Sequence, residues 1–292
     1  MPEVESAFLS VDPKNGAIRS LVGGFDFGRN KFNHATQAWR QPGSSFKPFI
    51  YSAALEKGFT PISIVDDAPI SIPASVTGSQ VWEPKNYDGR FEGPMRVRTA
   101  LAKSKNMVSI RLLQTSGVHF VQDYVTRFGF DAEKHPAYLT MALGAGSVTP
   151  WQMVTGYSVF ANGGYKIQPF IVSQIRDDKD QVLAEAQPQV AGDESLLVID
   201  PRNAFLMDSM LRDVTIYGTA GRASGTLKRR DLAGKTGTTN EHVDAWFCGY
   251  QRTLVGCSWI GFDQPRNMGR GETGGTAALP AWIGYMGKAL KD

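Results

Sequence analysis

Metal-binding and redox residues are scarce in this sequence, and their scarcity narrows the chemistry that it can support. The 292 residues include only two cysteines, Cys248 and Cys257, and four histidines. The cysteines do not have metal-ligand spacing, and no histidine clusters with them. The sequence also has no glycine-rich phosphate loop of the dinucleotide or P-loop type. We therefore expect no metal and no cofactor.

Long apolar runs and a strong charge of one sign are also missing. No stretch approaches the ~20 apolar residues of a membrane-spanning helix, and residues 1–4 do not begin a signal peptide. The net charge is only +3, and the lysines and arginines are scattered rather than gathered into one stripe. We therefore expect no nucleic-acid partner. The length allows one large domain or two small ones, with a proper core.

The sequence does contain strand-like segments at both ends and helical patterns between them. Strands are predicted at residues 5–11, 17–22, 170–176, 181–186, 232–239, 245–250 and 254–262, and helices at 95–114, 117–128, 149–161, 201–215 and 277–290. The economical arrangement is an α+β fold. In it, the N-terminal hairpin and the three C-terminal strands form one antiparallel sheet that is covered by helices.

One stretch, residues 41–48, carries the first chemical signal. Pro-Gly at 42–43 breaks the chain and apolar residues at helical spacing follow, which predicts a helix beginning here. Ser44 would stand at the helix start, with Lys47 three residues later on the same face. A lysine within reach of a serine hydroxyl can activate it as a nucleophile, provided that burial lowers the lysine pKa. Taken alone, a Ser-x-x-Lys string is more often a capping serine beside a solvated lysine.

Two further motifs follow this stretch in the chain. Ser104-Lys105-Asn106 is the only Ser-x-Asn, and Lys235 begins the only Lys-Thr-Gly, in the string Lys-Thr-Gly-Thr-Thr. Each motif alone has an ordinary explanation, as a polar helix boundary or as a β-edge with a tight turn. The presence of all three in this order is hard to attribute to chance.

With these three motifs the chain resembles the penicilloyl-serine transferases, the superfamily of penicillin-binding proteins and serine β-lactamases. More narrowly, it resembles the transpeptidase domain of a class A (bifunctional) penicillin-binding protein. The segments that match family patterns are residues 41–48, 82–87, 100–106, 160–164, 235–239, 244–247 and 274–282. The resemblance therefore covers nearly the whole chain.

The resemblance implies the serine β-lactamase/DD-transpeptidase-like fold, an antiparallel sheet flanked by helices plus a mostly helical lobe. The sheet lobe would take residues 1–40 and 200–292, and the helical lobe residues 60–165, with the active site between them. The family would place a glycosyltransferase domain and a membrane helix before residue 1, so we expect both to be missing here. The native protein would be extracytoplasmic, anchored in the inner membrane and facing the periplasm.

Carried over residue by residue, the resemblance assigns catalytic roles to four side chains: Ser44, Lys47, Ser104 and Asn106. Ser44 would attack the carbonyl of a D-Ala-D-Ala terminus, and Lys47 would accept its proton as the general base. Ser104 would relay that proton to the departing amine. Asn106 would hold the amide group of the peptide.

The Lys-Thr-Gly motif would bind the substrate. Lys235 would lie on an edge strand and attract the terminal carboxylate, to which the hydroxyls of Thr236 and Thr238 would donate. Gly237 has no side chain, so the substrate could pack against the strand there. The backbone N–H groups of Ser44 and Thr238 would form the oxyanion hole.

The implied reaction is the cross-linking of peptidoglycan stem peptides through an acyl-serine, with β-lactams as inhibitors that acylate the same serine. Other cell-wall synthesis proteins are potential partners, and a membrane would be contacted only through the missing anchor. A serine β-lactamase is the first alternative, but class A members carry a Glu-x-x-x-Asn that is absent between Asn106 and Lys235. The second alternative is a non-catalytic β-lactam sensor domain.

Several residues near the motifs have a simpler interpretation. Trp82, Tyr87 and Trp246 are interpreted as packing residues or loop anchors rather than substrate contacts. Glu241, His242 and Asp244 follow the Lys-Thr-Gly strand and could suggest a triad. The family chemistry needs no histidine, so a turn at the end of the strand explains them.

Cys248 and Cys257 flank a predicted turn. They could lie opposite each other on adjacent strands, close enough for a disulfide only if the side-chain geometry allows it. An extracytoplasmic location would permit oxidation, but a buried free cysteine is the commoner state in a core strand. We therefore predict two free thiols.

Overall fold

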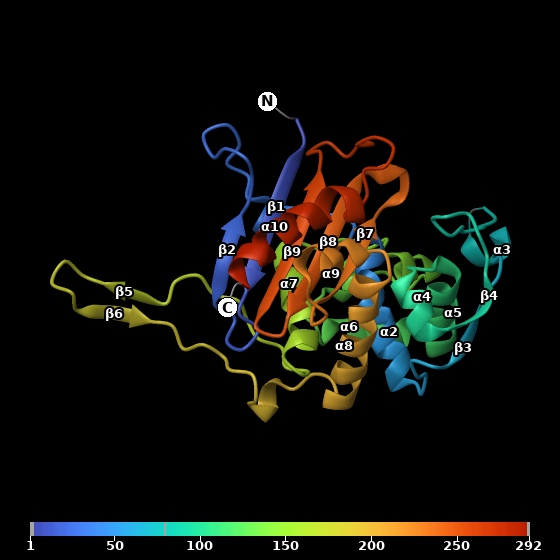
Figure 1. The fold of residues 1–292 in the computed structure, drawn as a ribbon, viewed down its shortest axis with the longest axis horizontal. Helices are drawn as coiled ribbons and strands as arrows, with labels where there is room; N and C mark the ends of the chain where they lie inside the picture. The colour runs from blue at the N-terminus through green and yellow to red at the C-terminus, as the bar shows by residue number, and fades with distance from the viewer. Residues whose placement is uncertain (1–2, 79, 291–292) are drawn as a thin grey trace.

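Five strands form one antiparallel sheet, in the order β2-β1-β9-β8-β7 (Figure 1). The figure shows the computed structural model, which describes residues 3–78 and 80–290. The strands are β1 (Glu5–Val11), β2 (Ile18–Val22), β7 (Ala233–Thr238), β8 (Asp244–Gln251) and β9 (Leu254–Gly261). The two ends of the chain meet where β1 pairs with β9, with Leu9 opposite Cys257. This confirms the predicted antiparallel sheet, and it leaves β7 at one edge.

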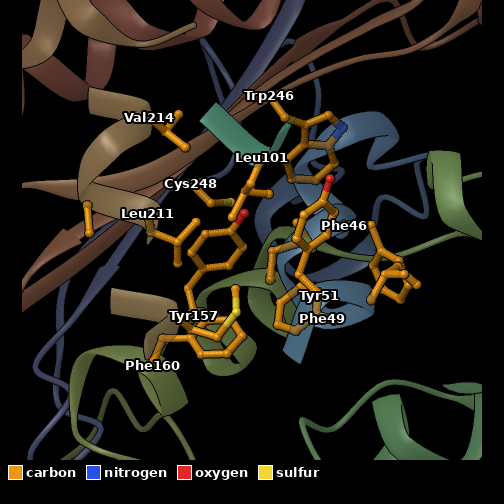
Figure 2. Close-up of a cluster of buried hydrophobic side chains, with 14 of the residues drawn as sticks. Phe46, Phe49, Tyr51, Leu101, Tyr157, Phe160, Leu211, Val214, Trp246 and Cys248 are labelled. Carbon is orange, nitrogen blue, oxygen red and sulfur yellow. The ribbon is translucent and has the colours of Figure 1, made fainter. Parts of the chain in front are cut away.

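Helices cover both faces of this sheet. On one face lie α9 (Gly221–Leu227) and α10 (Leu279–Ala289), whose Trp282 packs against Phe247 of β8 at 4.9 Å between ring centroids. On the other face lie α2 (Lys47–Glu56), α7 (Pro150–Ala161) and α8 (Pro201–Ile216). Figure 2 shows buried side chains of these helices, including Tyr157 and Leu211, in one cluster with Trp246 and Cys248 of β8. Alternate side chains of β8 thus pack against helices on opposite faces of the sheet.

The segment between α2 and α7 lies beside the β7 edge, and most of its regular elements are helices (Figure 1). It contains β3 (Ile64–Asp67), α3 (Ala74–Thr77), β4 (Gly93–Arg96), α4 (Val97–Ala102), α5 (Asn106–Ser116) and α6 (Val118–Thr126). Two small elements lie outside it, α1 (His34–Gln37) and the hairpin of β5 (Gln174–Arg176) with β6 (Val182–Glu185), which projects from the body. No helix within residues 3–78 and 80–290 has both the length and the apolarity to cross a bilayer.

The predicted single helix at residues 95–114 is wrong, because the chain breaks at Ser104. Ser104 has a φ of 59°, in the left-handed region. Its N–H donates to the Leu101 carbonyl at 3.0 Å, and the N–H of Lys105 donates to the Ala100 carbonyl at 2.9 Å. These two bonds form a Schellman motif, which usually ends a helix with glycine. A serine in that position gives no sequence signal of a helix end.

The prediction of two free thiols is also wrong, because Cys248 and Cys257 form a disulfide. The β8–β9 register places them directly opposite each other, and their Cα atoms are 4.1 Å apart. That short separation is typical of a non-hydrogen-bonded pair in an antiparallel ladder. Buried cysteines are more often free, but here the short turn sets a strand register that brings the two sulfur atoms together.

Candidate active site

A cavity of about 800 Å³ lies where the β7 edge of the sheet faces the turn between α4 and α5. Of the predicted site residues, five contribute to its wall: Ser44, Ser104, Asn106, Thr236 and Thr238. Lys47 and Lys235 are fully buried behind that wall. The structure thus brings residues from three distant parts of the chain to one site.

Ser44 lies in a short 3-10 turn, Gly43–Phe46, that leads directly into α2. This turn packs against the backbone of β7. A Cβ atom at Gly43 would lie 2.7 Å from the Thr238 carbonyl oxygen, and one at Gly237 would lie 2.3 Å from the Pro42 carbonyl oxygen. The close approach at Gly237 is therefore to the protein itself, and the packing of substrate against the strand at this position stays a prediction. The approach sets the backbones of Ser44 and Thr238 side by side.

Lys47 is held by two acceptors that cannot donate. Its Nζ donates to the Ser104 carbonyl and to Asn106 Oδ1, both at 2.7 Å, and lies 3.3 Å from Ser104 Oγ. A neutral amine has two N–H bonds, and these two acceptors use both of them. The remaining position of Nζ, a lone pair in the neutral form, is then left for the Ser104 hydroxyl or for a proton from the cavity.

Burial favours that neutral form. Desolvation lowers the pKa of Lys47 well below its usual value, and the charge of Lys235 lowers it further, against an opposing effect of Asp67. The Ser44 hydroxyl has no hydrogen-bond partner among residues 3–78 and 80–290, so it faces the cavity without a link to Lys47. Such links are often long before substrate binds. The structure therefore supplies a lysine whose neutral form is favoured by burial and a serine hydroxyl that keeps its hydrogen-bonding capacity for the cavity.

Lys235 approaches Ser104 from the opposite side. Its Nζ donates to Ser104 Oγ at 2.8 Å and to the Thr236 carbonyl at 3.0 Å. Burial lowers the pKa of Lys235 to about 7. The Ser104 hydroxyl thus lies between two amines, which is the position that a proton relay needs.

Ser104→Gly and Ser104→Ala separate the conformation of Ser104 from its chemistry. Both variants lose the hydroxyl between the two lysines, so we expect both to be acylated about 100-fold more slowly than the unsubstituted chain. Ser104 has a φ of 59°, which glycine adopts without the strain that alanine would have there. We therefore expect Ser104→Gly to be more stable than Ser104→Ala by about 1 kcal/mol, measured by urea unfolding. Equal stability would show that the backbone is not strained here.

The two lysines predict a bell-shaped pH dependence of acylation. In its predicted role as the base, Lys47 must be neutral to accept a proton, so we expect the rate to rise with pH through the lowered pKa of Lys47. Lys235 must be charged to attract a carboxylate, and it loses its proton as the pH rises through about 7. Arginine stays charged at every working pH, so Lys235→Arg should lose the alkaline limb. The measurement is the second-order rate of β-lactam acylation against pH, and an unchanged alkaline limb in Lys235→Arg would contradict the assignment.

The two threonines of the strand already have protein partners. The Thr236 hydroxyl lies 2.7 Å from that of Thr219, and Thr238 Oγ1 accepts from the Gly274 N–H at 3.0 Å. Thr219 also lies on the cavity wall. It precedes α9 and matches no motif, so sequence reasoning misses it. Each of these hydroxyls keeps further hydrogen-bonding capacity toward the cavity.

On the outer wall of the cavity, the interpretation of Tyr87 as a packing residue is wrong. Tyr87 is 72% exposed and lies edge-on to the His242 ring, with 6.0 Å between centroids, so it is not a packing residue. Trp82 lines the cavity too, but it is partly buried against the core, as predicted for a packing residue. Trp246, in contrast, is buried and donates to the Gln41 carbonyl at 2.9 Å, as a loop anchor would.

The residues that could suggest a triad are separated. Asp244 is buried away from the cavity, where it accepts from Arg40 at 2.7 Å and from Trp259 at 2.9 Å. Glu241 and His242 stay on the cavity wall. Within the part of the chain that the structure describes, no group of three His, Cys, Asp or Glu side chains could hold a metal ion.

Comparison with known sequences identifies relatives across almost the whole chain. The family model described as "Penicillin binding protein transpeptidase domain" matches residues 6–256. "Penicillin-binding protein 1A" of Neisseria flavescens is 52% identical over 290 residues, which cover 99% of this chain and 36% of that protein. The protein of the same name from Pseudomonas aeruginosa is 48% identical over 337 residues, covering 100% and 41%. The chain thus spans little more than a third of the length of these relatives.

Solved structures give the same result. The crystal structure of penicillin-binding protein 1A from Haemophilus influenzae has a TM-score of 0.95 at 42% identity, covering 100% of this chain and 48% of that one. The PonA1 protein from Mycobacterium tuberculosis in complex with penicillin V has a TM-score of 0.83 at 28% identity, covering 100% and 79%. The shared fold therefore extends over the sheet, the helices and the cavity together.

Proposed function

The chain belongs to the penicillin-binding protein transpeptidase domain family, and we propose that it performs the family's serine DD-transpeptidase reaction with Ser44 as nucleophile. Domains of this family bind β-lactams, as the penicillin V complex shows for a relative. The observation that carries the assignment of roles is the environment of Lys47, whose two carbonyl acceptors leave one position on Nζ for an incoming proton.

The first half-reaction follows from this geometry. Lys47 takes the Ser44 proton as Ser44 Oγ bonds to the penultimate D-Ala carbonyl carbon of the donor peptide. The N–H groups of Ser44 and Thr238 stabilise the oxyanion, an interaction that is often worth a few kcal/mol. When the tetrahedral intermediate collapses, the C–N bond breaks and the proton passes through Ser104 to the leaving D-Ala amine. Lys235 and Thr238 hold the carboxylate of that leaving group.

The second half-reaction uses the same residues in reverse. The amine of a second stem peptide replaces the departed D-Ala, loses a proton to Lys47 through Ser104, and attacks the ester. The new amide is the peptidoglycan cross-link, and Ser44 recovers its proton. In this proposal the sheet lobe supplies Lys235, the helical lobe supplies Ser104 and Asn106, and α2 with the turn before it supplies Ser44 and Lys47.

The setting of the reaction is part of the same proposal. Stem peptides with a D-Ala-D-Ala end are the proposed substrates, and these exist outside the cytoplasm, so we place the domain on the extracytoplasmic side of the inner membrane. The relatives are about three times as long as this chain, and we propose that the domain acts beside a glycosyltransferase domain in a membrane-anchored protein. Neither a β-lactamase nor a sensor domain is supported by the comparisons.

An aminolysis assay tests the proposed function. The chain is incubated with a donor peptide ending in D-Ala-D-Ala and with increasing amounts of an acceptor amine such as a D-amino acid. We expect the donor to partition toward the new amide as the amine concentration rises, with water as the slow substitute. Mass spectrometry of the products gives the ratio of amide to acid. Release of acid alone at every amine concentration would show a carboxypeptidase or hydrolase instead.

A further inference from the structure

A buried hydrogen-bond chain lies directly behind Asn106. The backbone N–H of Asn106 donates to Asn86 Oδ1 at 2.8 Å, and Asn86 Nδ2 donates to Asp67 Oδ1 and to the Arg90 carbonyl, both at 2.7 Å. Asp67 is completely buried and Asn86 is 4% exposed. This series of hydrogen bonds therefore connects β3 and the loop after α3 to the first residue of α5.

The direction of every bond in this chain is fixed. A carboxylate and a carbonyl only accept, so the amide nitrogen of Asn86 must face Asp67 and Arg90, and its oxygen must face Asn106. The neighbouring Lys85 carbonyl accepts from Asn106 Nδ2 at 2.7 Å. The amide oxygen of Asn106 is then left to face Lys47. Residues 85 and 86 thus fix both the backbone and the side-chain amide of Asn106.

This direction matters to Lys47. If the Asn106 amide were flipped, its nitrogen would face Lys47 Nζ and would donate to the lone pair that has to accept the Ser44 proton. With the oxygen in place, Lys47 donates there at 2.7 Å and keeps the lone pair for the reaction. The orientation of the Asn106 amide therefore decides whether the lone pair of Lys47 is free to accept a proton.

We propose that Asn86 and Asp67 are positioning residues for the acylation step. They hold the backbone of Asn106 and, with the adjacent Lys85 carbonyl on its amide nitrogen, keep the Asn106 oxygen toward Lys47, so that Lys47 keeps its lone pair toward the cavity. This inference rests on the proposed function of Lys47 as the base. Asp67 is the last residue in this series of hydrogen bonds. It also accepts from the Glu92 N–H at 2.9 Å, and its carboxylate lies 3.5 Å from Lys105 Nζ. Asn86 lies on the cavity wall, but it is only 4% exposed and both of its amide atoms are already hydrogen-bonded, so both residues act through Asn106.

Asp67 has a second, electrostatic effect that provides an independent readout. The charged groups that act on Lys47 are Lys235 from β7, which lowers the pKa of Lys47, and Asp67 from β3, which raises it. Removing the Asp67 charge should therefore lower the pKa of Lys47. The acidic limb of the acylation profile should then move to lower pH, a change that loosened packing alone would not produce.

Asn86→Ala is the first test, with acylation of the 292-residue chain by a chromogenic cephalosporin as the assay. Rates at several drug concentrations separate the acylation rate constant from the dissociation constant. We expect the rate constant to fall by about 10- to 100-fold, because a misplaced group near the chemistry costs up to that much, while the dissociation constant changes little. The matched control is Glu92→Gln, at a residue a few positions after Asn86. It weakens the ion pair between Glu92 and Lys105, whose atoms are 2.9 Å apart, but leaves the bonds to Asn106 intact. It should stay within about threefold of the unsubstituted chain.

Asp67→Asn is the second test, because its oxygen can still accept from Asn86 while its charge is gone. The acidic limb of its pH profile should shift downward. The inference is overturned if Asn86→Ala keeps its rate constant within about threefold, if Glu92→Gln loses as much as Asn86→Ala, or if the limb of Asp67→Asn does not move. Failure of the unsubstituted chain to form any acyl-enzyme would instead overturn the proposed function, so the two failures are distinguishable.

Discussion

Replacing Ser44 by alanine is expected to abolish covalent labelling of this chain by a fluorescent penicillin, with a loss of about 10⁴-fold or more in the acylation rate. The β-lactam carbonyl has no other nucleophile in the position of Ser44, at the start of α2 and beside the backbone of Thr238. The fold should be unaffected, because the Ser44 hydroxyl makes no hydrogen bond within residues 3–78 and 80–290 that the substitution could remove. Gel fluorescence and thermal unfolding of the same preparation measure both effects.

Ser45→Ala is the matched control for this substitution. It removes a hydroxyl from the adjacent residue, where Ser45 Oγ donates to the Pro42 carbonyl at 2.6 Å. We expect it to lower stability by about 1 kcal/mol and to retain most of the labelling. Labelling of Ser44→Ala that persists on Ser45 or Ser104 would show that the nucleophile is assigned wrongly. The pair of variants thus separates loss of the nucleophile from damage to its turn.

The sheet could be predicted from the sequence because its information is local. Each of the strands β1, β2, β8 and β9 is a short β-prone run next to a turn signal, and the hairpin turns fix the neighbours. The sequence also predicts that β1 joins the C-terminal strands, since apolar runs at both ends of a chain need a common core. The pairing of Leu9 with Cys257 is what that expectation requires.

The arrangement of side chains around the motifs could be predicted only in part. Ser44, Ser104 and Lys235 can be assigned from the sequence because each belongs to a short motif that resembles one of the penicilloyl-serine transferases. Contacts between distant segments have no such signal. The bond from Asn106 to Asn86 and the pairing of Thr236 with Thr219 depend on how loops return to the site.

Lys105 illustrates the physical reason. In the sequence it is one charged residue at the centre of Ser-x-Asn, where a solvated side chain would be the usual expectation. In the structure it is 2% exposed and pairs with Asp88 and Glu92, each at 2.9 Å. Burial alone would lower the pKa of Lys105, but hydrogen bonds to Glu92 and Asp88 outweigh it and raise the pKa. Only the fold brings those carboxylates together.

The second large effect concerns how the acyl-enzyme decays. Three carboxylates line the cavity: Glu83, Asp88 and Glu241. Glu83 accepts from Ser71 at 3.1 Å, Asp88 pairs with Lys105, and Glu241 is exposed. Across residues 3–78 and 80–290, no carboxylate hydrogen-bonds to the side chains of Ser44, Lys47 or Ser104. The glutamate that positions a deacylating water in class A β-lactamases has no counterpart in these contacts.

We therefore expect a penicilloyl-enzyme that survives for many minutes. The opened ring stays tethered to the ester on Ser44 and occupies the place that an acceptor amine would need, so only water can release it. Without a positioned general base, that attack should be slower than in a β-lactamase by about two to four powers of ten. Intact mass spectrometry after a short pulse of penicillin should show one added drug mass that persists after the free drug is removed. An adduct that clears within seconds while penicilloate accumulates would show that the chain is a hydrolase, and the transpeptidase proposal would then fail.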